Sequence, residues 1–156
     1  MIESRNSEMT DECGICRPDR PKPPGGIIHD DGIWRVEHIA PPIPLLGWLV
    51  VAPLRHVTTF ADLSDNESAH FGPLTQRVSA ALTAALHPTR VYVALFGEGE
   101  GFTHIHFHVV PRPPELAAEF RGPKVFGLWA KAQDEGDLAP LSEVSALADR
   151  LRRALW

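Results

Sequence analysis

Three histidines stand two residues apart in the segment THIHFHVVPR, residues 103–112. They are His104, His106 and His108, and the residues that separate and follow them are apolar. Successive side chains of a β-strand point to opposite faces, so in a strand the three imidazoles would share one face. A helix would scatter them by about 100° per residue. We therefore expect a strand with a histidine face, on which the bases of neighbouring imidazoles lie about 6.5–7 Å apart.

Such a face suits two kinds of chemistry, and the spacing alone does not decide between them. Three imidazoles can bind a catalytic metal, because imidazole is a common metal ligand. Alternatively, one histidine can be a nucleophile that the other two orient. The Gly-rich loop GEGEG, residues 97–101, precedes the histidines, and such loops often bind phosphate through backbone N–H groups. Neutral imidazole can attack phosphorus without a separate base, so phosphoryl transfer fits this neighbourhood.

The rest of the chain predicts the elements that position this face. A hairpin with strands at residues 27–29 and 33–39 is expected around the turn Asp31-Gly32. Further apolar strands are expected at residues 47–52 and 91–96.

Two helices complete the predicted fold. Ser64 and Glu67 form a capping box at the start of the first, which Pro88 ends near His87. Ser142 is expected to cap the second helix. Residues 111–139 show neither a helical nor a strand periodicity of apolar residues. The order of elements predicts an α+β domain, a mostly antiparallel sheet with helices on one side.

Composition limits the class of protein. The chain of 156 residues suits one domain, which we expect at residues 13–156 after a disordered tail at residues 1–12. A net charge of −5 without a basic run argues against a nucleic-acid polymer as partner. The apolar runs are too short to cross a membrane, and the acidic N-terminus does not resemble a signal peptide. We expect a soluble, cytoplasmic protein.

The only two cysteines form the pair Cys13-Gly14-Ile15-Cys16, which has three readings. A redox pair is expected at the start of a helix near a βαβ unit, whereas this pair precedes a Pro-rich segment, residues 17–26. A zinc site needs four ligands, and this motif supplies two. The third reading is a reduced pair that binds nothing.

The histidine segment resembles a known family. His104-Ile105-His106-Phe107-His108-Val109-Val110 matches the His-φ-His-φ-His-φ-φ signature, with φ apolar, of the histidine triad superfamily of nucleotide hydrolases and transferases. LVVAPLRHV, residues 49–57, resembles the upstream strand of that family, and the resemblance covers about residues 13–112. It implies a small α+β domain that forms a homodimer through a continuous sheet. It also implies a C-terminal segment that reaches toward the partner's site, which would bring Trp129 and Trp156 there.

The resemblance also implies a role for each histidine. His106 would attack the α-phosphorus of a nucleotide and form a nucleotidyl-histidine intermediate, which water resolves. His108 would donate to the α-phosphate oxygens, and His104 would orient the group. A zinc-bearing branch of the family, which includes proteins like the diadenosine polyphosphate hydrolases, has a CxxC motif at this position. The implied structural zinc would be held by Cys13, Cys16, His56 and His104.

The chain departs from the family pattern around the substrate. Glu100 stands where the family has Gln, and Gly101 where it has a hydroxyl side chain. His38 stands where an acidic residue often holds the ribose, and Trp48 where many members have His. Together with Gly99, we take His38, Glu100 and Gly101 as candidate substrate-binding residues. Carboxylates in the loop would repel a phosphate unless they turn outward, bind a cation or meet a basic leaving group.

The sequence thus predicts a nucleotide hydrolase or nucleotidyl transferase that cleaves dinucleoside polyphosphates or nucleoside phosphoramidates through His106. The alternative is a zinc-stabilised nucleotide-binding module with little or no turnover. A third reading, a catalytic metal bound by the three histidines, predicts that chelation abolishes activity while the fold survives.

Overall fold

The computed structural model of the protein describes residues 12–155. It contains one five-stranded antiparallel sheet with the strand order β1-β2-β3-β5-β4. The strands are β1 (Ile27–Asp30), β2 (Trp34–His38), β3 (Leu49–Pro53), β4 (Arg90–Leu95) and β5 (Phe107–Arg112). The α-helices are α2 (Asp65–Leu86), α3 (Gly127–Glu135) and α4 (Leu141–Leu155). The predicted α+β fold is confirmed, whereas the predicted tail at residues 1–12 lies, except for Glu12, outside the described residues.

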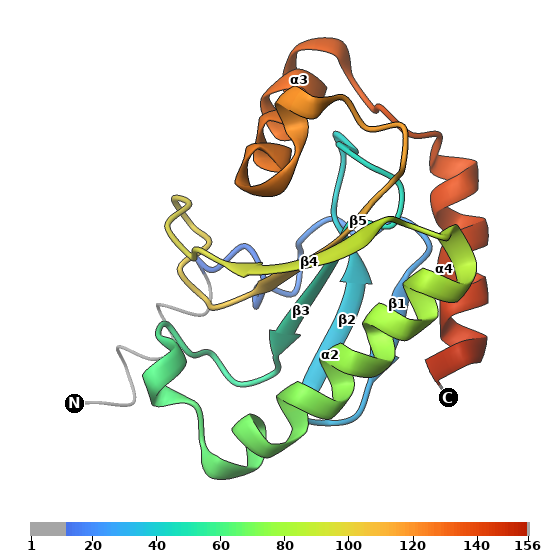
Figure 1. Ribbon diagram of the computed structural model, residues 1–156. Helices are drawn as coiled ribbons and strands as arrows, with labels where there is room; N and C mark the ends of the chain where they lie inside the picture. The colour runs from blue at the N-terminus through green and yellow to red at the C-terminus, as the bar shows by residue number, and fades with distance from the viewer. Residues whose placement is uncertain (1–11, 156) are drawn as a thin grey trace.

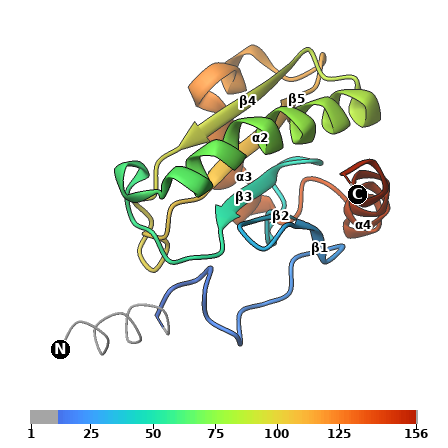
Figure 2. The ribbon, with the colours of Figure 1, turned by 90° about the horizontal axis from the view of Figure 1, so that it is seen from below.

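The two long helices, α2 and α4, cover one face of the sheet (Figure 1). The core between them is formed by apolar residues of all three layers, among them Trp34, Val51, Val109, Leu82 and Leu151. A second apolar cluster packs α3 and the loop between β2 and β3 next to the opposite face, through Trp48, Val110 and Leu128. On that same opposite side, the segment at residues 12–26 runs along β2 and β3 (Figure 2). No helix in the described part of the chain is long and apolar enough to span a membrane.

Local sequence signals fix several boundaries as expected. The hairpin turn is closed by the Asp31 carboxylate, which accepts hydrogen bonds from the backbone N–H groups of Ile33 and Trp34 at 2.9 and 2.7 Å. Ser64 caps α2, and both hydrogen bonds of the predicted capping box are present. The predicted cap at Ser142 is wrong, because α4 already begins at Leu141 and the carbonyl of Pro140 accepts from Val144.

The histidine strand is shorter than predicted. β5 begins at Phe107, so His104 and His106 lie just before it, with a bend at His104. The alternation nevertheless continues through this segment. Ile105, Phe107 and Val109 belong to the core under α2, and the histidines between them point away from that core.

The start of α2 holds the loop that carries His56. Arg55 donates two hydrogen bonds to the Glu67 carboxylate, at 3.0 and 2.7 Å, and a third to the Asp62 carbonyl. The indole N–H of Trp34 donates to the Glu67 carbonyl at 3.0 Å, which ties the same turn to β2. The side chain of Glu67 is 7% exposed, so its charge depends on these partners.

We predict that Glu67→Gln lowers the free energy of unfolding by about 1–3 kcal/mol at pH 7, the scale of a hydrogen bond to a charged group. The Arg55 hydrogen bonds lower the pKa of Glu67 from 4.5 to about 2 in the folded protein. The carboxylate therefore contributes its stability above about pH 4.5, and this contribution is lost as the pH falls toward 2. Urea unfolding at several pH values measures the difference.

The matched control is Asp65→Asn, which removes an exposed carboxylate from the same helical turn. It should change the stability by less than about 0.5 kcal/mol. A Glu67→Gln effect as small as the control, or one that is equal at pH 7 and pH 2, would contradict this account.

Candidate functional site

His106 is held in one tautomer by the backbone of its own segment. Its Nδ1 lies 2.9 Å from the carbonyl oxygen of His104. A carbonyl can only accept, so Nδ1 carries the ring proton and Nε2 keeps a free lone pair. The half-buried ring of His106 therefore presents a nucleophilic nitrogen.

His108 is held in the opposite tautomer. The indole N–H of Trp48 donates to its Nδ1 at 3.0 Å. An indole nitrogen can only donate, so the ring proton of His108 stands on Nε2. Burial, and then the neighbouring His106, lower the pKa of His108 to about 4, so the ring is neutral near pH 7. The centroids of the His106 and His108 rings are 4.9 Å apart, which places a proton donor beside the ring of His106.

The register of the sheet places an acidic side chain on the same face. Glu37 of β2 is paired with Val50 of β3, and Val50 is paired with His108 of β5. Side chains of directly paired residues in an antiparallel sheet share one face. Glu37 and His108 are therefore on one face of the sheet and in line across it, two strands apart. At the usual strand spacing their backbones are about 9.6 Å from each other.

His38 points to the other face, contrary to its expected role at the ribose. It pairs with Leu49 of the core under α2 and is 1% exposed. Its Nδ1–H donates to the Ile39 carbonyl at 3.0 Å, and its Nε2 accepts from the Gly47 N–H at 2.9 Å. Neither ring nitrogen is left for a ribose hydroxyl, so we do not retain His38 as a ligand of the substrate. The cause is strand alternation, which turns Glu37 toward the site and His38 away from it.

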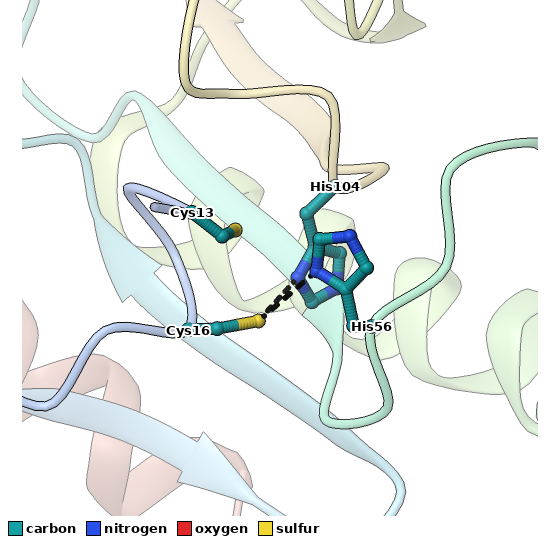
Figure 3. A group of neighbouring side chains, drawn as sticks. All are labelled: Cys13, Cys16, His56 and His104. Atoms are coloured by element: carbon teal, nitrogen blue, oxygen red, sulfur yellow. Dashed lines mark hydrogen bonds between the residues drawn. The ribbon is translucent and has the colours of Figure 1, made fainter. Parts of the chain in front are cut away.

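The structure brings the two cysteines to two histidines (Figure 3). The Cys16 Sγ lies 3.4 Å from His56 Nδ1 and 3.0 Å from His104 Nδ1. One sulfur or nitrogen atom from each of Cys13, Cys16, His56 and His104 lies within 4.8 Å of the others. Burial and the neighbouring Cys13 raise the pKa of Cys16 to about 12, which disfavours the free thiolate, whereas a cation bound at the sulfur would favour it. Two sulfurs and two imidazoles in this compact group are a donor set that suits Zn²⁺.

This group is connected to His106 through His104. The side chain of His104 belongs to the Cys2His2 group, and its carbonyl oxygen accepts the hydrogen bond from His106. Burial, and then the neighbouring His56, lower the pKa of His104 to about 4. A neutral His104 can serve as a metal ligand while its backbone fixes the tautomer of His106.

Gly14, between the two cysteines, has a packing role that the sequence analysis missed. Its N–H donates to the Gly101 carbonyl at 2.7 Å. A Cβ at Gly14 would lie 2.4 Å from the ring of Phe102, so a larger residue does not fit without a shift. The ring of Phe102 is in turn 6.5 Å from that of His106, measured between centroids. The CxxC segment therefore packs directly on the loop before the histidines.

The loop residues chosen from the sequence lie in different surroundings. Gly99 lines a cavity beside His106 and His108, as does Glu98. Glu100 is exposed to solvent. The carbonyl of Gly101 is occupied by the hydrogen bond from Gly14.

Two cavities meet at the histidines. The first, which we call the β2 cavity, has a volume of about 280 Å³ and lies between the N-terminal segment and the end of β2. Its walls include Arg17, Arg20, Glu37, Ile39 and Val50, and His38 also borders it although both of its ring nitrogens are bonded to backbone groups. The second, which we call the aromatic cavity, has a volume of about 270 Å³ and is lined by Phe96, Glu98, Phe102, Phe126 and Trp129. Both cavities include His106, His108, Phe102 and Trp129, so a group bound at the two histidines can extend into each.

The segment after β5 supplies part of these walls. The ring of Phe126 packs edge-on against Trp48 and His108, with centroid distances of 5.1 Å in both cases. The ring centroids of Trp129 and Trp48 are 6.2 Å apart, and Trp129 lines both cavities of its own chain. Trp129 was expected near a partner's site, and it lies beside the histidines of the same chain. Trp156 is outside the described residues.

Comparisons with known proteins agree with the fold. The family model of the HIT domain matches residues 22–115, more than half of the chain. A histidine triad protein from Bradyrhizobium japonicum is 25% identical and has a TM-score of 0.67; the match covers 83% of this chain and 90% of that one. One from Sinorhizobium meliloti is 21% identical with a TM-score of 0.64, over 83% and 88% of the two chains. A Zn-bound histidine triad family protein from Mycobacterium smegmatis is 22% identical with a TM-score of 0.58, over 83% and 82%. The chain therefore belongs to the HIT domain family, that of the histidine triad proteins.

Proposed function

We propose that the protein is a nucleotide hydrolase or nucleotidyl transferase that acts through a covalent intermediate on His106. Members of the HIT family are generally nucleotide hydrolases or transferases. The observation that carries the proposal is the pair of complementary tautomers. The lone pair on Nε2 of His106 stands beside a ring whose Nε2 carries a proton.

The chemistry follows from these two rings. Nε2 of His106 attacks the α-phosphorus, the bond to the leaving group breaks, and a nucleotidyl-histidine forms. The Nε2–H of His108 donates to a phosphoryl oxygen, where charge is concentrated in the transition state. The bond to phosphorus makes the His106 ring cationic, and its Nδ1–H then donates more strongly to the His104 carbonyl. Water attacks the intermediate and releases a nucleoside monophosphate.

We place the nucleoside in the β2 cavity. Ribose and base carry several donors and acceptors, and this cavity offers Arg17 and Glu37 beside the apolar side chain of Ile39. Arg20 holds the Glu37 carboxylate with two hydrogen bonds of 2.6 and 2.7 Å. A carboxylate accepts at about four lone-pair positions, so Glu37 can also accept from ribose hydroxyls. On the other side of the phosphate, Gly99 remains the loop candidate, because it lines the aromatic cavity.

We further propose one structural zinc ion, held by Cys13, Cys16, His56 and His104. Bound there, the metal would supply no chemistry to the substrate, since a Cys2His2 set leaves no open position. It would hold the N-terminal segment on the sheet and keep the His104 carbonyl in place. The same geometry argues against a catalytic metal on the three histidines, because His104 turns its Nδ1 toward Cys16.

A binding module with little turnover is the second candidate. It is favoured by the carboxylates Glu98 and Glu100 in the loop where the family has uncharged donors. Turnover of any nucleotide with a substituted α-phosphate separates the two candidates.

We predict that the wild-type protein releases AMP from adenosine 5′-phosphoramidates or diadenosine polyphosphates. His106→Asn should lower kcat by about 10³-fold or more, because the variant has no nucleophile. Calorimetry should find AMP bound equally well by both proteins, since the Asn is polar and smaller. A variant with more than a tenth of the wild-type kcat, or a wild type that turns over none of these substrates, would rule out the proposal.

Trp48→Phe tests the tautomer of His108. Without the indole donor, Nδ1 of His108 is free to take the proton, and we expect kcat to fall about 10-fold or more with little change in KM. Trp48→His restores a ring N–H donor and should recover part of the lost kcat. If Trp48→Phe turned over at the wild-type rate per folded molecule, the indole would have no part in positioning His108.

The zinc proposal is tested by elemental analysis of protein purified without added metal. We expect about one zinc ion per chain, and Cys13→Ser should lower the zinc content and reduce the Tm by at least about 5 °C. Ser68→Ala, an exposed change on α2, serves as the control and should leave both unchanged. Metal-free wild-type protein with the same Tm as the zinc-treated sample would be evidence against a structural site.

A further inference from the structure

We propose that a cavity lined by basic side chains, next to the β2 cavity, binds a second phosphate group of the nucleotide, esterified to a ribose hydroxyl. The substrate class is then that of nucleoside 5′-phosphate derivatives with a further phosphate at the 2′ or 3′ position. The inference rests on the proposed function and specifies its substrate class. It also gives a role to the Pro-rich segment at residues 17–26.

The charge of this cavity points to an anion. The basic cavity, as we call it, has a volume of about 340 Å³ and lies between the Pro-rich segment and the strands β1 and β2 (Figure 2). Its charged lining residues are Arg17, Arg20, Lys22 and Arg35, and in the described chain no Asp or Glu lines it. These are four of the 15 Lys and Arg residues of a chain whose net charge is −5. The attraction for an anion is therefore local to this cavity.

Two of the arginines are held by carboxylates and still have donors to offer. Arg20 donates to Glu37 from Nη1 and Nη2, and Arg35 donates to Asp30 from Nε and Nη2. A guanidinium carries five N–H groups, so each arginine keeps others for a phosphate oxygen. The carboxylates fix the two guanidinium groups without themselves lining the basic cavity.

The other two cations are weakly paired. Arg17 Nε lies 3.7 Å from the Asp19 carboxylate, and the two side chains are 44% and 83% exposed, so this pair contributes little. Lys22 is exposed and forms no ion pair with any residue that the structure describes. Both cations can therefore turn to a bound phosphate without the loss of a strong interaction.

The backbone that carries three of these cations is restricted in advance. Each one directly precedes a proline, in Arg17-Pro18, Arg20-Pro21 and Lys22-Pro23. Proline fixes its own φ and limits the residue before it to extended conformations. The end of the segment is also tied down, because the Gly25 carbonyl accepts a hydrogen bond from Arg152 of α4. Little backbone entropy is then lost when the segment closes around an anion.

The basic cavity adjoins the β2 cavity on the side of the ribose. Ile15, Arg17, Arg20 and Pro21 line both cavities. Glu37, which accepts from ribose hydroxyls in the proposed function, lines only the β2 cavity of the two, whereas its partner Arg20 lines both. A phosphate on one ribose hydroxyl would therefore meet Arg20 while the other hydroxyl still donates to Glu37.

Arg35 extends the same arrangement along β2. It lies two residues before Glu37, so both side chains are on one face of the strand. This face is the one on which the Pro-rich segment lies, and Arg35 reaches the basic cavity from the sheet while Lys22 reaches it from the segment. A phosphate between them would meet cations from two sides.

The first experiment measures binding by calorimetry with the intact wild-type protein and four nucleotides. They are AMP, adenosine 2′,5′-bisphosphate, adenosine 3′,5′-bisphosphate and ADP. We expect at least one bisphosphate to bind at least about 10-fold more tightly than AMP, the effect of a hydrogen bond between charged groups. ADP carries its second phosphate at the 5′ end, away from the ribose hydroxyls, and controls for total charge. We expect ADP to gain less than half as much in binding free energy.

The second experiment measures turnover. Adenosine 5′-phosphoramidate is compared with the same compound phosphorylated at the position that the binding experiment favours. The added phosphate is remote from the bond that breaks, so the ratio of kcat/KM values reports on binding at the ribose. We expect this ratio to favour the phosphorylated compound by about 10-fold.

Variants assign the preference to the basic cavity. Lys22→Ala and Arg35→Gln should each lower the preference for the bisphosphate by about 3-fold or more, since each removes one cation from the lining. Neither residue lines the β2 cavity, so the affinity for AMP should not change. The matched control is Lys124→Ala, which removes an exposed cation that lines neither cavity and should leave the preference intact.

The outcomes separate this inference from the function on which it rests. A protein that binds and turns over none of these nucleotides would overturn both. A preference for a bisphosphate in binding, without turnover of either phosphoramidate, would support the basic cavity and contradict the hydrolase. Turnover with no gain from the ribose phosphate, an equal gain from ADP, or a preference that survives both Lys22→Ala and Arg35→Gln would overturn the basic cavity alone.

Discussion

Two hydrogen bonds to ring Nδ1 atoms determine what the histidine triad can do. Neutral imidazole has one donor and one acceptor, so whatever occupies Nδ1 decides the state of Nε2. The His104 carbonyl accepts a hydrogen bond from Nδ1 of His106, so Nε2 of that ring keeps its lone pair. The Trp48 indole N–H donates to Nδ1 of His108, so Nε2 of that ring carries the proton. Rings of the same residue type, two positions apart, thereby acquire opposite chemical roles. The rest of the site serves to keep these two partners in place.

The fold holds the first partner, the His104 carbonyl, from several sides. The side chain of His104 lies in the Cys2His2 group, and the next residue, Ile105, donates to the Val57 carbonyl at 2.7 Å. The loop that contains Val57 is tied to α2 through Arg55 and Glu67. The second partner, Trp48, is buried under Phe126 and Trp129. Segments far apart in the sequence thus converge on two ring nitrogens.

The sequence predicted the features that depend on local pattern or on a specific motif. The hairpin turn at Asp31, the capping box of Ser64 and the α+β order follow from short-range rules, and the structure confirms them. The CxxC motif with its two histidine partners also came together as the family resemblance implied. His38 was assigned to the ribose because the family motif was aligned without regard to the face on which a strand side chain lies. Side chains alternate between the two faces of β2, and counting from the buried Trp34 puts Glu37 on the face of the site. Phe126 and Trp129 were missed because their segment has no helical or strand period, and their positions depend on tertiary packing alone.

The tautomers can be observed directly. Two-bond ¹⁵N–¹H correlation spectra of the zinc-loaded protein, with ¹⁵N in the histidine rings, report which ring nitrogen of His106 and His108 is protonated. The account predicts a proton on Nδ1 of His106 and on Nε2 of His108 at neutral pH, with His106→Asn and His108→Asn used to assign the signals. A His106 ring protonated on Nε2, or two rings that both average between tautomers, would contradict it.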